Sequence, residues 1–425
     1  MYRPIALHLL LIALTLSADP KTDNPPKATP TGELYQLSLD LIPELVRQHN
    51  PDLANARALV MEIEARAGMA GLRDNPEIVT SFQNDPRFRE VGGRIGVIQS
   101  FPVTERLFHE KRVSKAEVNI AAGEVASVEQ RLIGQANLLL VRLLALRQHE
   151  SLHDAHLELA DELADYTAMA ASKGEGSQLD ATQSRLDAEQ LKLELRQIDL
   201  EATRLQSELR TLLGLPSTAR IEVGGKLREA TFTPFPKVVP ENRADHQTLT
   251  LLIEAASEAT ELEKARRWQD IAVGLFTEVS REEDAPIGLE REHRIGFSLS
   301  IPLPLWNRNE GAIKSSEIRT SRLKQSLEAL KIRIANEASS AHDDLMRQLR
   351  LAEDIQENLI PKAEAQVDKT LAAYRLGQIS LEPVLRAREQ HINLRAAHLH
   401  ALRDYNLAHA RLMNALGNTR WNSKP

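Results

Sequence analysis

An internal duplication constrains the fold of this chain more than any other feature. Segment 93–118 (GRIGVIQSFPVTERLFHEKRVSKAEV) and segment 293–318 (HRIGFSLSIPLPLWNRNEGAIKSSEI) match at a constant offset of 200 positions. Both contain Arg-Ile-Gly, then a Ser two residues before a Pro, and later a Glu. Ordered matches that include Gly and Pro are not expected from two unrelated helical sequences. The chain is therefore predicted to fold as two copies of one structural unit.

The ends of the two copies also match. A Gly-x-x-Ser motif and a later Leu-Gly pair recur at an offset of 203 positions: Gly174, Ser177 and 213–214, then Gly377, Ser380 and 416–417. Equal offsets mean that the helices between these points have equal length. The predicted division is a signal peptide (1–18), a flexible segment (19–37), a first repeat (38–214), an equatorial linker (215–242), a second repeat (243–417) and a tail (418–425).

Each repeat is predicted to contain a helix, two strands, a very long helix, a tight turn and a further helix. In the first repeat these are 38–72, 76–84, 93–102, 106–172 and 177–214, with the turn and its flanks forming a tip at 173–184. In the second they are 243–268, 270–280, 293–302, 308–376 and 380–417, with a tip at 376–387. The fold class is therefore mostly α with a small β part.

The helices after the strand pairs carry the pattern of coiled coils. Segment 106–172 contains no proline and would extend about 100 Å as a helix. The next helix has two heptad rows: Leu179, Leu186, Leu193 and Leu200, and Leu191, Ile198, Leu205 and Leu212. Such rows predict coiled-coil hairpins. The linker 215–242 holds four prolines and a possible strand at 221–223. It is predicted to pack as a belt outside the hairpins.

Composition excludes several classes of protein. The chain has no cysteine, so it has neither disulfides nor thiolate metal sites. A net charge of −7 without a basic tail argues against nucleic-acid binding. No catalytic motif is present, so neither an enzyme nor a cofactor is predicted. Arg3 followed by an apolar run from Ile5 to Leu16 predicts the secretory signal.

The strands are too few to form a closed structure in one chain. Four strands cannot close into a barrel, for which about eight is the practical minimum. Open strand edges are not tolerated in lipid. If the strands enter a membrane, several chains must share the barrel. A trimer with twelve strands is the arrangement that matches a hollow helical tube.

The order of elements, repeated twice, resembles the TolC-like family of outer-membrane efflux proteins over essentially the whole mature chain. AYRLGQISLEPVLRARE (373–389) is close to the family's tip signature, although Lys173 makes the first tip looser. SIPLPLWNRNEG (300–311) is similar to the heavy-metal cation-efflux branch. Many relatives carry an amino-terminal lipidated cysteine that this chain lacks.

This resemblance implies an outer-membrane homotrimer in contact with membrane lipid. Its periplasmic helices would form a tunnel, and the strands would form a twelve-stranded transmembrane barrel. The implied partners are a periplasmic adaptor and an inner-membrane pump of the resistance-nodulation-division type. The implied function is the exit duct of a tripartite efflux system for small cargo such as divalent metal cations. A duct for drug-like molecules or secreted proteins, and a soluble periplasmic coiled-coil scaffold, remain alternatives.

Three groups of residues are candidates for function. Gly174, Ser177, Gly377 and Ser380 would shape the tips that an adaptor reads. Asp165 and Asp368 each lie nine residues before a tip glycine. If both face the lumen, a trimer would place six carboxylates in one gating ring; otherwise they are exposed helix acids. His149, His153 and His156 share one helical face and could bind a divalent ion; otherwise they are solvated surface histidines.

Overall fold

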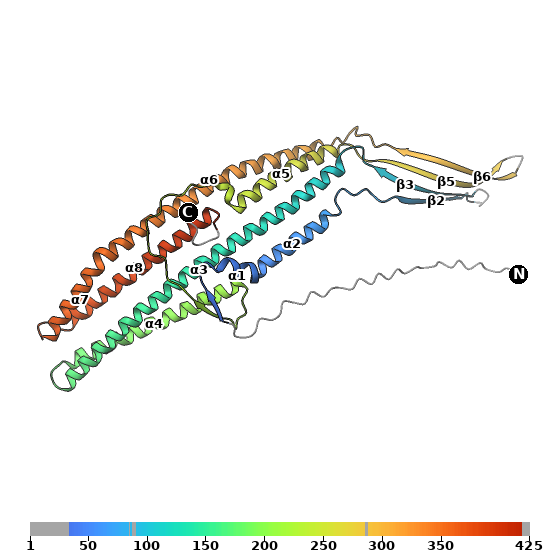
Figure 1. Ribbon diagram of the computed structural model, residues 1–425. Helices are drawn as coiled ribbons and strands as arrows, with labels where there is room; N and C mark the ends of the chain where they lie inside the picture. Colours follow the sequence, from blue (N-terminus) through green and yellow to red (C-terminus); the bar gives the residue numbers. More distant parts are fainter. Residues whose placement is uncertain (1–33, 85, 87–90, 285–287, 419–425) are drawn as a thin grey trace, which may run out of the picture.

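The computed structural model describes residues 34–84, 86, 91–284 and 288–418. The predicted signal peptide at 1–18 lies outside these residues. The chain forms an elongated, gently curved bundle of helices with a β-sheet at one end and two helical tips at the other (Figure 1). None of the described helices combines the length and hydropathy that crossing a lipid bilayer requires.

The two predicted copies are both present. The first contains α1 (Ile42–His49), α2 (Pro51–Ala67), β2 (Glu77–Asn84), β3 (Val91–Phe101), α3 (Arg106–Ser172) and α4 (Gln178–Leu213). The second contains α5 (Ala244–Ala265), β5 (Ile271–Asp284), β6 (Gly288–Ser300), α6 (Glu310–Asp354), the π-helical turn η2 (Ile355–Leu359), α7 (Ile360–Arg375) and α8 (Glu382–Ala415). The hairpin α3–α4 of the first copy therefore corresponds to α6–α7–α8 of the second.

Two helices predicted as continuous are interrupted near proline. The helix expected over 38–72 breaks at Asn50, because Pro51 has no N–H to continue the ladder. The Asn50 side chain accepts a hydrogen bond from Leu53 N at 2.9 Å and so caps α2. The helix expected over 308–376 widens into η2 just before Pro361, where an interior proline disturbs regular α-helical hydrogen bonding.

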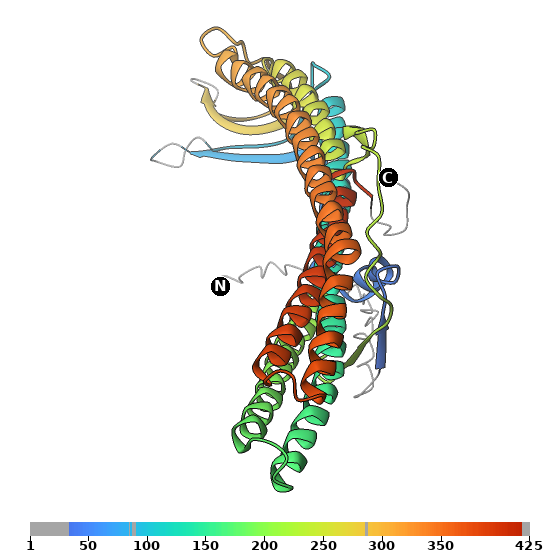
Figure 2. The ribbon, with the colours of Figure 1, turned by 90° about the vertical axis from the view of Figure 1, so that its left-hand side faces the viewer.

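The amino-terminal segment and the linker are joined by a pair of short parallel strands. Residues 19–37 were expected to be flexible, but β1 (Leu34–Leu37) pairs in parallel with β4 (Arg220–Val223). The pairing is stabilised because Leu37, Ile221 and Val223 are buried in the core between α1, α3 and α4. The rest of the linker, including the 3₁₀ turn η1 (Pro240–Asn242), runs along the outside of the helices as the predicted belt (Figure 2).

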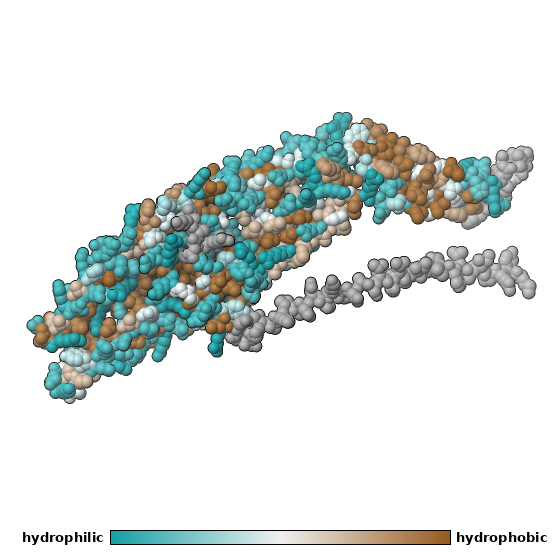
Figure 3. Space-filling model, viewed as in Figure 1, coloured by the Kyte–Doolittle hydropathy of each residue, from teal (hydrophilic) through white to brown (hydrophobic). Residues whose placement is uncertain are grey.

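The four long strands form one antiparallel sheet in the order β2-β3-β5-β6. Its register aligns Val97, Leu275 and Phe297 on one face, which is apolar and exposed. This face forms the hydrophobic patch at one end of Figure 3. β5 and β6 extend further than predicted into the polar segment 281–292. Both outer strands, β2 and β6, have an unpaired edge within the described chain.

The two heptad rows of α4 have different roles. Leu191, Ile198 and Leu205 are buried against the neighbouring helices, which confirms the coiled-coil hairpin. The other row is 57–74% exposed: Leu179, Leu186, Leu193 and Leu200. A row of exposed leucines is costly in water unless another surface covers it. The α3–α4 hairpin therefore has one apolar edge that this chain does not cover.

Candidate functional site: the helical tips and the seam between the hairpins

Both tips turn on a glycine with a left-handed backbone. Gly174 has φ +74° and Gly377 has φ +70°, a conformation that residues with a Cβ rarely adopt. No atom lies within 4 Å of the position that a Cβ would take at either glycine. The tips therefore end in a bare backbone turn facing open space.

The two tip serines differ in their contacts, although the sequence predicted that both help to shape their tips. Ser177 caps α4, since its hydroxyl accepts a hydrogen bond from Leu179 N at 3.1 Å. Ser380 caps no helix, because α8 begins later, at Glu382. The physical reason is Leu381, whose side chain is buried beside Leu163 and Val384. This burial draws the second tip toward α3.

The two predicted gate acids are both exposed. Asp165 lies on α3 and Asp368 on α7, at matching distances above their tip glycines. Within the described residues neither carboxylate forms an ion pair or side-chain hydrogen bond. Both side chains are therefore accessible to ions in solution. A single chain does not bring them into a ring.

Two polar contacts near the tips join the hairpins and were not predicted. The Tyr374 hydroxyl on α7 donates to Asp180 Oδ2 on α4 at 3.4 Å. Arg388 Nη1 on α8 donates to the backbone oxygen of Leu159 on α3 at 3.0 Å. Burial, and then the Asp180 carboxylate, raise the pKa of Tyr374. Tyr374 and Asp180 are 194 positions apart, so no local pattern could reveal this contact.

The three α3 histidines do not form a metal site. Among the described residues no three metal-ligating side chains come together. Their shared helical face packs against α8 and α4, so they are not solvated surface histidines either. The ring centroids of His149 and His153 are 4.6 Å apart. His153 is buried, with Nδ1 3.4 Å from Glu194 Oε2.

The histidines of α3 meet further histidines on α8. The ring centroid of His149 lies 5.6 Å from that of His400, and the centroid of His156 lies 5.9 Å from that of His391. Burial is the largest cause that lowers the pKa of His149 to about 4, followed by His153, His400 and Arg403. Burial also lowers the pKa of His156 to about 4, with His391 the next cause.

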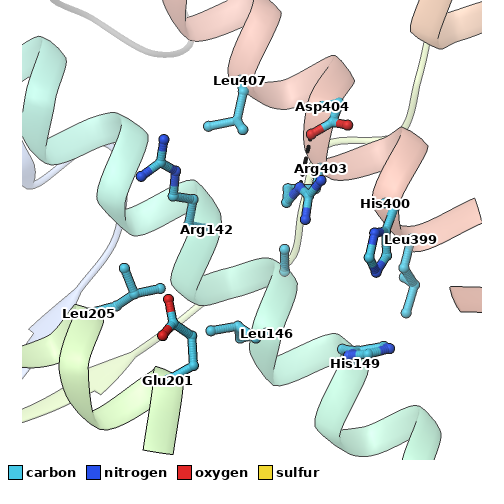
Figure 4. A pocket seen from close by; sticks show the side chains of 11 residues that line it. Arg142, Leu146, His149, Glu201, Leu205, Leu399, His400, Arg403, Asp404 and Leu407 are labelled. Carbon is cyan, nitrogen blue, oxygen red and sulfur yellow. Dashed lines mark hydrogen bonds and ion pairs between the residues drawn. The ribbon is translucent and has the colours of Figure 1, made fainter. Parts of the chain in front are cut away.

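A pocket of about 360 Å³ opens beside this region, between α3, α4 and α8 (Figure 4). Arg142 and His149 reach it from α3, Glu201 from α4, and His400 and Arg403 from α8. Arg403 is paired with Asp404 at 2.8 Å. The pocket mixes both signs of charge with leucine side chains, which gives it no single ligand preference.

Comparison with known proteins gives a family match for part of the chain and a fold match for nearly all of it. Residues 237–418 match the model of the outer membrane efflux protein family. This range contains the end of the linker and the second repeat. Curated protein sequences give no match. The fold is similar to that of CusC, with 15% identity, a TM-score of 0.71 and coverage of 94% of this chain and 99% of CusC.

Two further solved channels share the fold. VceC from Vibrio cholerae has 16% identity, a TM-score of 0.69 and coverage of 89% of this chain and 96% of VceC. The CmeC outer membrane channel of Campylobacter jejuni has 13% identity, a TM-score of 0.71 and coverage of 91% of this chain and 87% of CmeC. These similarities show the predicted fold class over nearly the whole chain.

The family match covers the second repeat, and the first repeat is its internal copy in both sequence and structure. The second repeat therefore matches the outer membrane efflux protein family, and the chain as a whole has the fold of solved outer membrane channels.

Proposed function

We propose that this chain is the exit duct of a tripartite efflux system, assembled as a homotrimer. The observation that carries the proposal is that the sheet and the helical layer of this chain both end in edges that nothing in the described chain covers. The sheet ends in unpaired strands at β2 and β6, and the helical layer ends in the exposed leucine row of α4. Three copies placed side by side would pair β6 with the next β2 in a twelve-stranded barrel.

The same arrangement would cover the apolar helical edges. The leucines of α4 are exposed, and so are Ile332 and Leu351 of α6 and Leu376 at the end of α7. The helices α4 and α6 lie at opposite edges of the helical layer (Figure 1). Contact between α4 of one chain and α6–α7 of the next would bury both sets. Burial stabilises such an interface by roughly 25 cal/mol for each Å² of apolar surface removed from water.

We propose that a periplasmic adaptor docks at the tips and that an inner-membrane pump of the resistance-nodulation-division type supplies the cargo. The bare glycine turns at Gly174 and Gly377 support this, because they offer backbone and open space to a partner. The tips also lie at the end of the molecule opposite the sheet (Figure 1).

We propose divalent metal cations as the cargo, in keeping with the heavy-metal branch that the segment 300–311 resembles. The accessible, unpaired carboxylates of Asp165 and Asp368 support a cationic cargo, since rings of acids favour cations in pores. Drug-like molecules are the competing cargo. Export of divalent metal salts and of drugs by the same strain, with and without this chain, separates the two.

Conductance across a planar bilayer tests the duct itself. The purified protein should insert spontaneously from detergent and give discrete, ohmic conductance steps with a preference for cations. It should also resist extraction from membranes by high salt. A protein that high salt removes from membranes and that gives no conductance would be a periplasmic scaffold, and the duct would be ruled out.

A further inference from the structure

Five histidines form a seam between the two hairpins of the chain. His149, His153 and His156 lie on α3, and His391 and His400 lie on α8. We call these residues the histidine seam. α3 belongs to the first hairpin and α8 to the second, so the seam joins the two copies of the duplicated unit. Neither the family match nor the contacts described at the tips assign a role to these five histidines.

The apolar core is interrupted where the seam lies. On α3 the large core cluster, with the partly buried side chains packed against it, ends at Leu146, and the small clusters near the tips begin at Leu157 and Leu163. Between these clusters, α3 meets α8 through imidazole rings with centroids 5.6 and 5.9 Å apart. Apolar burial therefore holds the hairpins together above and below the seam, while the seam itself depends on uncharged imidazoles.

The charges around the seam are mostly positive on α8. Arg388, Arg395 and Arg403 face it from that helix, with Asp404 paired to Arg403. Arg395 Nε donates to His391 Nε2 at 3.0 Å, which requires that nitrogen to be unprotonated. A proton on His391 would turn this hydrogen bond into a repulsion between two donors.

The carboxylates near the seam are unevenly placed. Glu194 on α4 lies against His153, and Glu201 on α4 shares the pocket with His149 and with Arg142 of α3. Glu364 and Asp368 on α7 act on His391. Asp187 of α4 and Glu162 of α3 act on Arg388. Apart from burial, the groups that lower the pKa of His149 and His156 are histidines and arginines.

We propose that the histidine seam is an acid-sensitive joint: protonation of His149 and His156 drives α8 away from α3 and separates the two hairpins toward their tips. The consequence for transport, a wider periplasmic end of the duct at low pH, rests on the proposed function. The separation itself is a property of the chain and does not.

The direction of the pH effect follows from the two states of the histidines. In the closed seam the pKa of His149 and His156 is about 4, and in a solvated, separated state it would return to about 6.5. The closed state therefore binds fewer protons between these values. Closure is fully favoured above about pH 6.5 and is progressively lost as the pH falls toward 4.

Distances between spin labels at the two tips test the joint. The chain has no cysteine, so Glu175→Cys with Gln378→Cys gives one label on each exposed tip. Labelled chains diluted into an excess of unlabelled chains leave the distance within one chain as the main signal. Lowering the pH from 7.5 to 4.5 should raise the ratio of separated to closed hairpins at least about tenfold.

Two variants make the test decisive. His149→Gln/His156→Gln keeps polar side chains that cannot be protonated, so the distances should stay closed at pH 4.5. His49→Gln, outside the seam on α1, should respond like the unmodified chain. Equal distances at both pH values in the unmodified chain would overturn the proposal, and so would an unchanged response in the double variant. Neither outcome depends on conductance, which tests the duct.

Discussion

At the scale of single residues, the linker is held by a few buried polar groups. Tyr405 on α8 is fully buried, and its hydroxyl donates to Thr231 O at 2.8 Å and accepts from Thr231 N at 3.2 Å. The neighbouring Asn406 donates to Arg228 O at 2.9 Å and accepts from Arg228 N at 3.1 Å. These contacts give partly buried backbone groups of the belt their hydrogen-bond partners.

Tyr405→Phe should therefore destabilise the protein by about 1–3 kcal/mol, because it leaves the N–H and the oxygen of Thr231 unpaired. The measurement is the midpoint of thermal unfolding in detergent, together with the rate of proteolysis within the linker. Tyr166→Phe is the matched control, since Tyr166 is 48% exposed and should tolerate the change. Equal unfolding midpoints for the two variants would show that the belt is held by other contacts.

Asp165 and Asp368 give a second prediction at this scale. Asp165→Asn/Asp368→Asn removes charge and keeps size, and no described contact of either carboxylate is lost. In planar bilayers the double variant should lose much of its preference for cations and its block by trivalent ions. Each single variant should fall between, because each repeat supplies half of the ring. Asp154→Asn is the control, because Asp154 is an exposed acid that lies earlier on α3 and further from the tip. Unchanged selectivity in the double variant would place both acids outside the lumen.

At the scale of elements, the helical and strand periodicities and the positions of glycine and proline were sufficient to predict most of the fold. The lack of proline predicted α3 with its observed bounds, the heptads predicted α4, and alternation together with the internal repeat predicted the four long strands. The breaks at Asn50 and before Pro361 were missed, because a helical pattern can continue on both sides of a proline. β1 was missed because its partner β4 lies far along the chain, and pairing across such a distance leaves no local signal.

The candidate site was less predictable than the fold. The sequence located the tip glycines, because a turn with positive φ favours glycine and so can be recognised from the residue type. It did not reveal the Tyr374–Asp180 contact or the packing of His149 against α8. Helical spacing places residues on one face of their own helix, but it does not say which other helix covers that face.

The tips offer a prediction for the hairpins as elements. Gly377→Trp should leave the trimer and its conductance intact, since a side chain there meets open space, apart from about 1 kcal/mol of backbone strain. It should abolish export in cells by blocking the adaptor. Gly214 is the contrasting position, because a Cβ there would lie 2.2 Å from His49 O and disturb the fold. Normal export by Gly377→Trp would argue against docking at this tip.

At the scale of the whole molecule, the exposed leucine row of α4 is the proposed contact between chains. Leu186→Glu/Leu193→Glu would place two carboxylates in an apolar interface, where unpaired charges are costly. The variant should sediment in detergent as a monomer while keeping its helical content. Asp199→Lys changes the charge by the same magnitude at an exposed position about 100° around α4 from Leu200, and it should remain trimeric. A trimeric leucine variant would move the interface elsewhere.

The unequal tips have a consequence for stoichiometry. Three chains with two repeats each would present six hairpin ends in a ring that looks sixfold from a distance. The ends alternate, however, between one with a serine-capped helix and one drawn inward by the buried Leu381. A partner that reads both kinds would occupy six places in two affinity classes, and a partner that reads one kind would occupy three. As a trimer the duplicated chain would offer a threefold surface to whatever binds it, and a sixfold partner would need two versions of its own contact.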